Sequence, residues 1–388
     1  MSITDALPML SGVKIVDLTS VVFGPYATQI LADYGAEVVK IETPTGDVAR
    51  YTSQSAKSKG MSPTHLTLNR GKKSVALNLK DADDAEVMRQ LIAEADIFIH
   101  NVRDEAIKRL GLGYDEVKAL NEGIIYVHCV GFGSDGPYAG RQAYDDVIQV
   151  ATGATSLASR VDGDPTPRYM PTLIADKVGG LNAAYATMGA VIHKLRTGRG
   201  QFVEVPMFEA FTHFLLKDHL AGKAFDPPVG SLLYARQIEP DRQPFATKDG
   251  HIAVVPYSDA DWVRIFAEMG ASDVLEKEPV NTPVGRRQNT AILYQGIAAN
   301  MPNKTTAQWL EILQKARIAC MPVRDIDDIL EDPHLKATEF FKKREHPTEG
   351  TIYEMSDASR FSDWERPEQE GAPLVGQHTE EVKRKIGK

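Results

Sequence analysis

The stretch LSGVKIVDLTSVVFGPYATQILADYGAEVVKIETP, residues 10–44, predicts the fold class on its own. Two short runs rich in Val and Ile, at 13–18 and 36–42, have the composition of β-strands. Between them Pro25 opens a helical pattern, since proline is favoured in the first turn of a helix, and Gly35 ends it. A strand, a helix and a second strand in this order are typical of a parallel sheet with a right-handed crossover.

The same alternation continues along the first half of the chain. Further strands are predicted at 73–79, 96–102, 124–132 and 201–208. A helix is predicted over 81–95, where acids in the first turn suit the helix dipole and an apolar side follows. This pattern predicts an α/β protein with a mostly parallel sheet. Pro and Gly gather at 222–245, which indicates a linker, and a smaller α/β segment follows it.

Composition narrows the kinds of partner and the compartment. The 388 residues are too many for one compact core, which favours two domains. A net charge of −9 without a basic stripe argues against nucleic acid. No apolar run approaches the roughly 18 residues of a membrane helix, and the first residues lack a signal-peptide pattern, so we expect no membrane partner. The distant Cys129 and Cys320 fit no disulfide framework, which favours the cytoplasm.

One segment imitates a dinucleotide-binding motif. GFGSDG, residues 131–136, matches G-x-G-x-x-G after a predicted strand. That motif also requires a helix that opens at the glycines, and Pro137 and Gly140 interrupt one here. A glycine-rich turn is therefore the preferred interpretation. The ten histidines are scattered and no metal-ligand spacing occurs, so we expect no metal site.

Asp176 and the two glycines that follow it are the unusual feature of a long predicted helix. Its predicted apolar face consists of Val178, Leu181, Tyr185, Met188, Ile192 and Leu195, and Gly198 ends it. Gly179 and Gly180, expected in the first turn, each cost about 0.5–1 kcal/mol relative to Ala, unless backbone or a ligand must approach closely. Asp176 is either the N-cap of the helix, or a base or nucleophile beside free backbone N–H groups. Spacing alone does not decide between these roles.

Six segments, in one order along the whole chain, resemble the class III CoA-transferase family (CaiB/BaiF type). This family includes carnitine and formyl-CoA transferases and α-methylacyl-CoA racemase. The segments are the stretch at 10–44, NRGKKSVALNLK (69–80), GFGSDGPYAGRQAYDDVIQVATG (131–153), LIADKVGG (173–180), TGRGQFVEVPMFEA (197–210) and PLVGQHTEEV (373–382).

The resemblance implies a mechanism in which Asp176 is the nucleophile. Its carboxylate would attack an acyl-CoA thioester to give an acyl-aspartyl anhydride and CoA thiolate. The thiolate would return to the aspartyl carbonyl, and a second carboxylic acid would then take over the CoA. The glycines would make room for the thioester. CoA thioester is a substrate in this scheme, and no metal or prosthetic group is needed.

The resemblance also implies a set of CoA contacts. Carried over residue by residue, they fall on Val21, Leu77, Lys80, Asn101, Val102, Ala106, Arg109 and Gln142, with Tyr144 lining the same pocket. The apolar members have core packing as their alternative role, and Lys80 and Arg109 have that of surface charges. Family members often carry Arg where this chain has Thr43, so Arg70, Lys72 and Lys73 are the nearby candidates for phosphate contacts.

Substrate and reaction type are the remaining expectations. Val22 and Phe23 stand where formyl-CoA transferase has a Gln, which favours an acyl group larger or less polar than formyl or oxalyl. The alternative to transfer is a racemase, but its second base is a His where this chain has Tyr144, and an unactivated phenol is a poor base. A non-catalytic CoA-binding protein is the third interpretation, and the presence of Asp176 argues against it.

The resemblance finally implies the domain plan. We expect a large Rossmann-like CoA-binding domain from residues 1–221 and 331–388, and a linker with a small α/β domain at 222–330. Members of the family form interlocked homodimers, so we expect a second copy of this chain as a partner.

Overall fold

The structure is a computed structural model that describes residues 7–366 and 368–387. The chain divides into two compact units. The first combines residues up to 155 with 169–216 and the segment from 335 onward. The second combines residues 156–168 and 217–334. Each unit is described by itself below.

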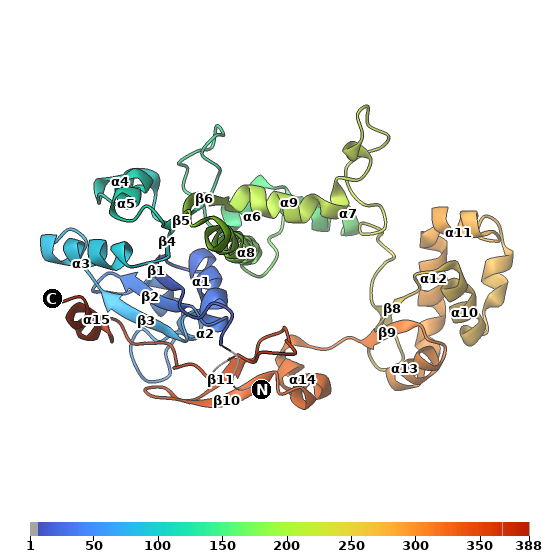
Figure 1. Cartoon of the computed structure of the whole chain (residues 1–388). Coiled ribbons are helices and arrows are strands. Elements are labelled where there is room, and N and C mark those ends of the chain that lie inside the picture. The colour runs from blue at the N-terminus through green and yellow to red at the C-terminus, as the bar shows by residue number, and fades with distance from the viewer. Residues whose placement is uncertain (1–6, 367, 388) are drawn as a thin grey trace. The chain divides into compact units, whose positions relative to one another are not determined.

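A six-stranded parallel sheet forms the centre of the first unit, in the order β3-β2-β1-β4-β5-β6 (Figure 1). The predicted strands are confirmed to within a few residues, because each run of Val and Ile is long enough for one buried strand. The strands are β1 Lys14–Leu18, β2 Glu37–Glu42, β3 Lys72–Ala76, β4 Ile97–His100, β5 Ile125–Val130 and β6 Gln201–Pro206.

Helices cover both faces of this sheet. Those wholly or partly in the first unit are α1 Phe23–Asp33, α2 Pro63–Leu68, α3 Ala82–Ala93, α4 Asp104–Arg109, α5 Tyr114–Leu120, α6 Asp145–Ala151, α8 Ile174–Thr197, α9 Met207–His219 and α15 Thr379–Lys385. Side chains alternate along the strands, so Ile15 packs into one core with α1 and α8, while its neighbour Val16 packs into a second core with α3 and α15. The expected α/β fold is confirmed, and it positions the carboxyl ends of β1, β4 and β5 together.

Helix α8 ends as predicted, but its predicted apolar face is wrong in part. Gly198 at its C-cap has a φ of 72°. Leu181, Tyr185 and Ile192 are about half exposed, and Leu195 is 81% exposed. The buried side instead carries small residues, Ala183, Ala184, Thr187 and Ala190 among them. The reason is the packing of α1 on α8 (Figure 1), since two helices approach closely only over small side chains.

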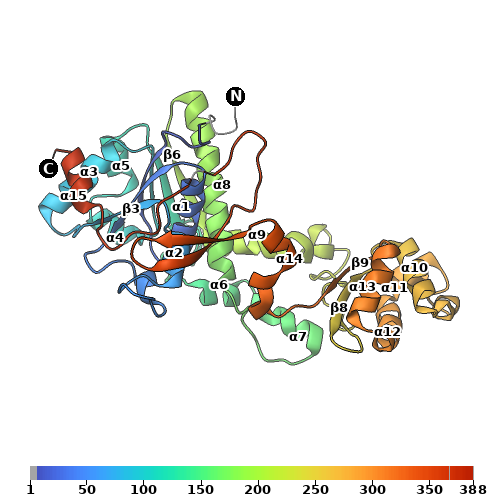
Figure 2. The same cartoon turned by 90° about the horizontal axis from the view of Figure 1, so that it is seen from below.

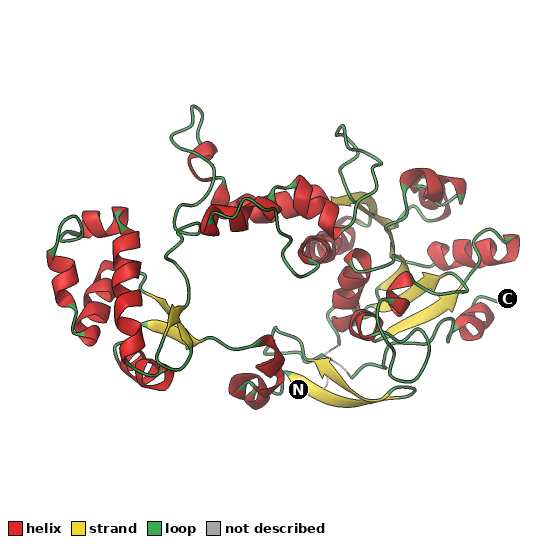
Figure 3. Cartoon of the chain, turned by 180° about the vertical axis from the view of Figure 1, so that it is seen from behind, coloured by secondary structure: helices red, strands yellow, loops and turns green. Residues whose placement is uncertain are grey.

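The C-terminal segment returns to the outer edge of the sheet. The backbone N–H of Ser74 in β3 donates to His378 Nδ1 at 3.1 Å, and the N–H of His378 donates to the Ser74 carbonyl at 2.9 Å. Helix α15 then lies beside β3 and α3, as Figures 1 and 2 show. A hairpin of β10 Phe341–His346 and β11 Gly350–Met355 precedes this segment and forms a separate antiparallel sheet (Figure 3).

The second unit has its own small antiparallel sheet, of order β7-β8-β9, and its own core. Its strands are β7 Phe245–Ala246, β8 His251–Val255 and β9 Ala319–Pro322. Its helices are α7 Leu157–Asp162, α10 Asp259–Met269, α11 Pro283–Gln288, α12 Thr290–Asn300, α13 Thr306–Lys315 and, in part, α14 Pro333–Ala337. Across the described ranges 7–366 and 368–387, no helix is both long and apolar enough to cross a membrane.

Candidate active site

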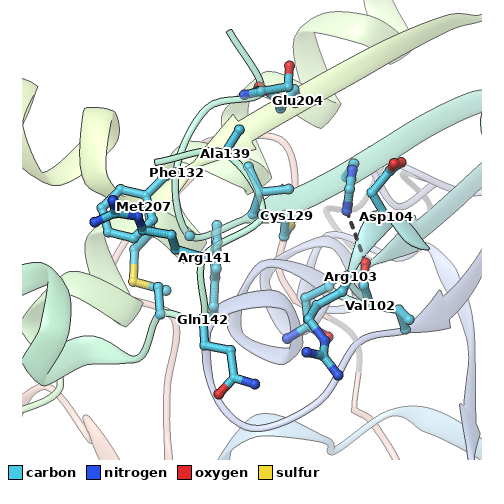
Figure 4. A pocket seen from close by; sticks show the side chains of 18 of the residues that line it. Val102, Arg103, Asp104, Cys129, Phe132, Ala139, Arg141, Gln142, Glu204 and Met207 are labelled. Atoms are coloured by element: carbon cyan, nitrogen blue, oxygen red, sulfur yellow. Dashed lines mark hydrogen bonds between the residues drawn. The ribbon is translucent and has the colours of Figure 1, made fainter. Parts of the chain in front are cut away.

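A pocket of about 850 Å³ lies in the first unit, where β1, β4 and β5 end. Ligands of open α/β sheets bind at this edge. Asp176 of α8 lines the pocket together with residues from several loops. In Figure 4, Arg141 and Gln142 lie on one side of the pocket, and Arg103 and Asp104 lie on the other. The sequence-predicted residues Val21, Asn101, Val102, Gln142 and Tyr144 are all among those that line it.

Asp176 is not the N-cap of its helix, so that interpretation is wrong. Helix α8 begins at Ile174, and Asp176 is its third residue, 8% exposed. Asp145 performs the capping from α6: its Oδ1 accepts the backbone N–H of Ala175 at 2.7 Å and that of Asp176 at 3.1 Å. The expectation of free N–H groups at this first turn is therefore also wrong for these two amides. The carboxylate of Asp176, by contrast, is not used for capping.

The pKa of Asp176 is raised to about 7, first by burial and then by the charge of Asp145. Both causes disfavour the ionised carboxylate. Asp145 itself is 3% exposed, and Gln149 Nε2 donates to its Oδ2 at 2.6 Å. A raised pKa makes the ionised form of Asp176 more basic and a better nucleophile than an ordinary aspartate. The pair therefore combines a carboxylate that caps α8 with a carboxylate that lines the pocket and has a raised pKa.

Gly179 and Gly180 lie in the second turn of α8 and make room for α1. A Cβ on Gly179 would come within 2.9 Å of the Phe23 ring. A Cβ on Gly180 would come within 2.9 Å of both the Phe23 carbonyl oxygen and the Tyr26 side chain. The space that these glycines leave is therefore filled by α1, and is not room for a thioester as expected from the sequence. Phe23, held in this way, forms part of the pocket wall.

Four of the sequence-predicted CoA contacts lie outside the lining of the pocket. Leu77 is buried in the core between the sheet and α3, which is its alternative role. Lys80 and Arg109 are exposed, and Ala106 is half-buried on α4. Ala106 and Arg109 lie on α4, close in sequence to the lining residues Asn101 to Glu105, whereas Leu77 and Lys80 follow the edge strand β3, which contributes no residue to the lining.

The nearby cations proposed for phosphate are occupied by other partners. Lys72 is fully buried, with Nζ donating to Thr28 Oγ1 at 2.8 Å and lying 3.4 Å from Asp17 Oδ2. Burial lowers the pKa of Lys72 to about 7. Arg70 pairs with Asp33, 2.5 Å away, and Lys73 lies 3.3 Å from Glu381 of α15. None of the three cations lines the pocket.

The sequence interpretation missed three cations that do line the pocket. Arg103, Lys108 and Arg141 are exposed side chains with access to it. Arg141 lies over the ring of Tyr138, 4.5 Å from its centroid. The available signal is position: Arg103 follows β4 at its carboxyl end, and Arg141 directly precedes Gln142. Such residues are where a parallel sheet places its ligand contacts.

The glycine-rich segment 131–136 is confirmed as a turn. The N–H of Gly133 donates to Glu209 Oε1 at 3.1 Å, and that of Ser134 donates to Glu204 Oε1 at 3.0 Å. Two carboxylates thus occupy backbone amides that a phosphate would need. Within the described residues, no group of three or more His, Cys, Asp or Glu side chains is arranged to hold a metal ion.

Comparison with known proteins adds the family. The model of a family described as CoA-transferase family III matches residues 10–379. A succinyl-CoA:glutarate CoA-transferase of Homo sapiens is 29% identical over 97% of this chain and 86% of its own length. A formyl-CoA:oxalate CoA-transferase of Streptomyces coelicolor is 30% identical over 96% of this chain and 94% of its own length. The crystal structure of a CaiB/BaiF family protein from Brucella suis covers 98% of this chain and 100% of that chain, at 26% identity and a TM-score of 0.82.

Proposed function

Because the chain belongs to CoA-transferase family III and transfers CoA between an acyl-CoA and a carboxylate, we propose that Asp176 is the nucleophile that carries the acyl group and then the CoA. The observation that supports this assignment is the state of its carboxylate. It lines the pocket, is buried with a raised pKa, and is spared the capping role by Asp145.

The reaction is a sequence of four exchanges at one carboxylate. A carboxylate oxygen of Asp176 attacks the thioester carbonyl, the C–S bond breaks, and CoA leaves as the thiolate. The thiolate attacks the aspartyl carbonyl of the mixed anhydride, which releases the donor acid and leaves CoA on Asp176. The acceptor carboxylate attacks this thioester and frees the thiolate again. Attack of the thiolate on the acceptor's acyl carbonyl gives the new acyl-CoA and restores Asp176.

CoA is proposed to occupy the pocket in front of Asp176. Its phosphates would meet Arg103 and Arg141, because guanidinium groups donate charge-assisted hydrogen bonds to phosphate oxygens. Lys108, which lies 2.7 Å from Asp104 Oδ2 in an exposed ion pair, would have to share its ammonium group with that carboxylate. Val21, Asn101, Val102, Gln142 and Tyr144 would contact the rest of the molecule.

The acyl group is proposed to be larger or less polar than formyl or oxalyl. Apolar side chains share the pocket with Asp176, among them Phe23, Phe132 and Met207. A racemase would need a second base, and Tyr144, the residue at the relevant position, is 67% exposed.

The domain plan and the assembly belong to the same proposal. A large domain of residues 1–221 and 331–388 and a small domain with linker at 222–330 are close to the two compact units. An interlocked homodimer would cover the exposed apolar side of α8 formed by Leu181, Tyr185, Ile192 and Leu195.

The compartment is proposed to be the cytoplasm, because the free thiols of Cys129 and Cys320 suit a reducing environment.

A mass-spectrometric assay in deuterated buffer tests the proposal. A panel of acyl-CoAs is offered with added carboxylic acids, and hydroxylamine is added to trap an activated carboxylate. We expect CoA transfer without deuterium at the α-carbon, and a hydroxamate on Asp176 only when acyl-CoA is present. Asp176→Asn should give neither transfer nor a hydroxamate. Asp146→Asn, which changes an exposed neighbour of Asp145, is its matched control and should retain both. A hydroxamate elsewhere would remove Asp176 from the role, and α-deuteration without transfer would favour the racemase.

A further inference from the structure

Val21 has a backbone conformation that its side chain disfavours. It lies in the loop between β1 and α1 and lines the pocket. Its φ is +69°, in the left-handed region. A β-branched residue is rare there, because its Cβ substituents crowd the following carbonyl group. Such strain persists only where the surroundings impose it, and it concentrates at functional sites.

Side chains from neighbouring strand ends fix the loop before Val21. The Thr19 carbonyl accepts a hydrogen bond from Lys40 Nζ at 2.8 Å. Asn101, which follows β4, binds both backbone groups of Ser20. Its Oδ1 accepts the Ser20 N–H at 3.0 Å, and its Nδ2 donates to the Ser20 carbonyl at 2.9 Å. The backbone on the N-terminal side of Val21 therefore has little freedom.

Asp47 fixes Val21 itself. The Val21 N–H lies 3.1 Å from Asp47 Oδ1 and 3.2 Å from Asp47 Oδ2. Oδ1 also accepts the N–H of Ala49, and Oδ2 lies 3.1 Å from Lys40 Nζ. The side chains of Lys40 and Asp47 are 0% and 2% exposed. The buried ion pair of Asp47 and Lys40 thus fixes the Val21 N–H, which belongs to the pocket wall. Lys40 also binds the Thr19 carbonyl, so it connects the two ends of this short loop segment.

We propose that Asp47 is a positioning residue for the transfer reaction: with Lys40, it holds Val21 in its left-handed conformation and so sets the wall of the CoA pocket before substrate binds. Asp47 does not itself line the pocket, so it acts through residues that it holds in place. Besides Val21, it caps the short helix that begins at the lining residue Val48, and an effect through Val48 would be the same in both backgrounds compared below. This inference rests on the proposed CoA site, because Val21 matters to the reaction only if CoA occupies the pocket.

The substitution Asp47→Asn tests whether the carboxylate holds the conformation of Val21 or only contributes to the general stability of the fold. Both of its oxygens accept hydrogen bonds, and its three partners, the N–H groups of Val21 and Ala49 and the ammonium of Lys40, are all donors. An asparagine has one acceptor and one donor group in the same space, so it must lose some of these bonds. Asp47→Asn is then compared in two backgrounds, Val21→Ala and Val21→Gly. Both backgrounds lack the valine side chain, but only glycine adopts a positive φ without strain.

The measurement is calorimetric titration with free coenzyme A. In the Val21→Ala background, we expect Asp47→Asn to raise the dissociation constant by about tenfold, because the strained conformation is no longer enforced. In the Val21→Gly background, we expect a rise of no more than about twofold. A role of Asp47 in general stability alone would give the same factor in both backgrounds, and that result would overturn the inference.

Folding itself gives the remaining outcomes. If Asp47→Asn yields folded protein only together with Val21→Gly, the rescue supports the inference. If it folds in neither background, Asp47 is needed for the fold rather than for the wall, and the inference fails. Wild-type protein that does not bind coenzyme A would instead contradict the proposed CoA site, so the two failures are distinguishable.

Discussion

The carboxylate of Asp145 accepts the backbone N–H of Asp176 at 3.1 Å, and its negative charge also raises the pKa of the Asp176 side chain. One side chain therefore acts on the other in two ways. The hydrogen bond fixes where α8 begins, and hence the position of Asp176, the proposed nucleophile. The charge of Asp145 makes the Asp176 carboxylate a stronger base and lowers its ionised fraction at neutral pH.

Asp145→Asn is expected to move the acidic limb of the activity profile to lower pH. An asparagine oxygen still caps α8, because Asn caps helices about as well as Asp. The like charge is gone, so the pKa of Asp176 falls, although burial continues to raise it. Single-turnover acylation of the enzyme, measured from pH 5 to 9, checks this. In the wild type the rate should fall below a pH of about 7. An unchanged limb in the variant would mean that Asp145 acts by capping alone.

Asp176→Asn is expected to abolish transfer and to stabilise the fold at alkaline pH. The pKa of Asp176 is about 7 in the folded protein and ordinary in the unfolded chain, so between about pH 4 and 7 the folded state holds the extra proton. The wild type therefore loses up to about 4 kcal/mol of its free energy of unfolding as the pH rises through this range. The asparagine variant does not titrate there. Denaturant unfolding at pH 5 and pH 8 measures the difference, which should be larger at pH 8. If the difference in free energy of unfolding between the two proteins is the same at pH 5 and pH 8, Asp176 does not titrate as a buried carboxylate.

Gly180→Ala is expected to destabilise the first unit, whereas Gly189→Ala in the same helix is not. The new Cβ at 180 would lie 2.9 Å from the Phe23 carbonyl oxygen, and backbone cannot easily move away. We expect a loss of about 1–3 kcal/mol in the free energy of unfolding. A Cβ at 189 meets nothing within 4 Å, so the better helix propensity of Ala should give a gain of up to about 1 kcal/mol. Similar effects at the two sites in thermal unfolding would argue against the close α1–α8 contact.

Arg103→Ala and Arg141→Ala are each expected to weaken binding of coenzyme A by about tenfold, because each removes a charge-assisted hydrogen bond donor. Arg109→Ala is the control, since Arg109 is exposed but does not line the pocket. Titration with coenzyme A and with its dephospho form would show which phosphate each arginine meets. A larger loss for Arg109→Ala than for the other two would return the phosphate site to the position that the family resemblance favours.

Leu195→Glu is expected to disrupt self-association. Leu195 is 81% exposed and belongs to the exposed apolar side of α8, together with Leu181, Tyr185 and Ile192. Such a group of exposed apolar side chains is typical of an interface. A buried glutamate at a dimer contact would cost several-fold in the dissociation constant of the dimer. Light scattering at several concentrations measures this, with Leu120→Glu on α5, 40% exposed, as the control. A wild-type protein that remains monomeric at all concentrations would contradict the proposed dimer.

The parts of the fold that depend on local pattern could be predicted from the sequence. Most of the strands β1 to β6 appear as short segments rich in Val and Ile, and Gly198 marks the end of α8. The buried side of α8 could not be predicted, because it depends on α1, whose close approach selects Ala and Gly over the larger Leu181 and Tyr185. In the site, Asp176 was predicted through its family motif. The role of Asp145 was not, since a side chain 31 positions away in the sequence replaces the local N-cap.

The return of the C-terminal segment to β3 has a consequence for folding during synthesis. His378 and Thr379 bind the backbone of Ser74 and Ala76, so they cover the outer edge of β3. These residues leave the ribosome after every strand of the sheet and after the whole second unit. At about 5–20 residues per second, the edge of β3 stays open for many seconds after β6 has emerged. An open strand edge pairs readily with other chains. The nascent protein is therefore exposed to misassociation between the emergence of β6 and that of His378 and Thr379, and a chaperone would be of most use to it in this interval.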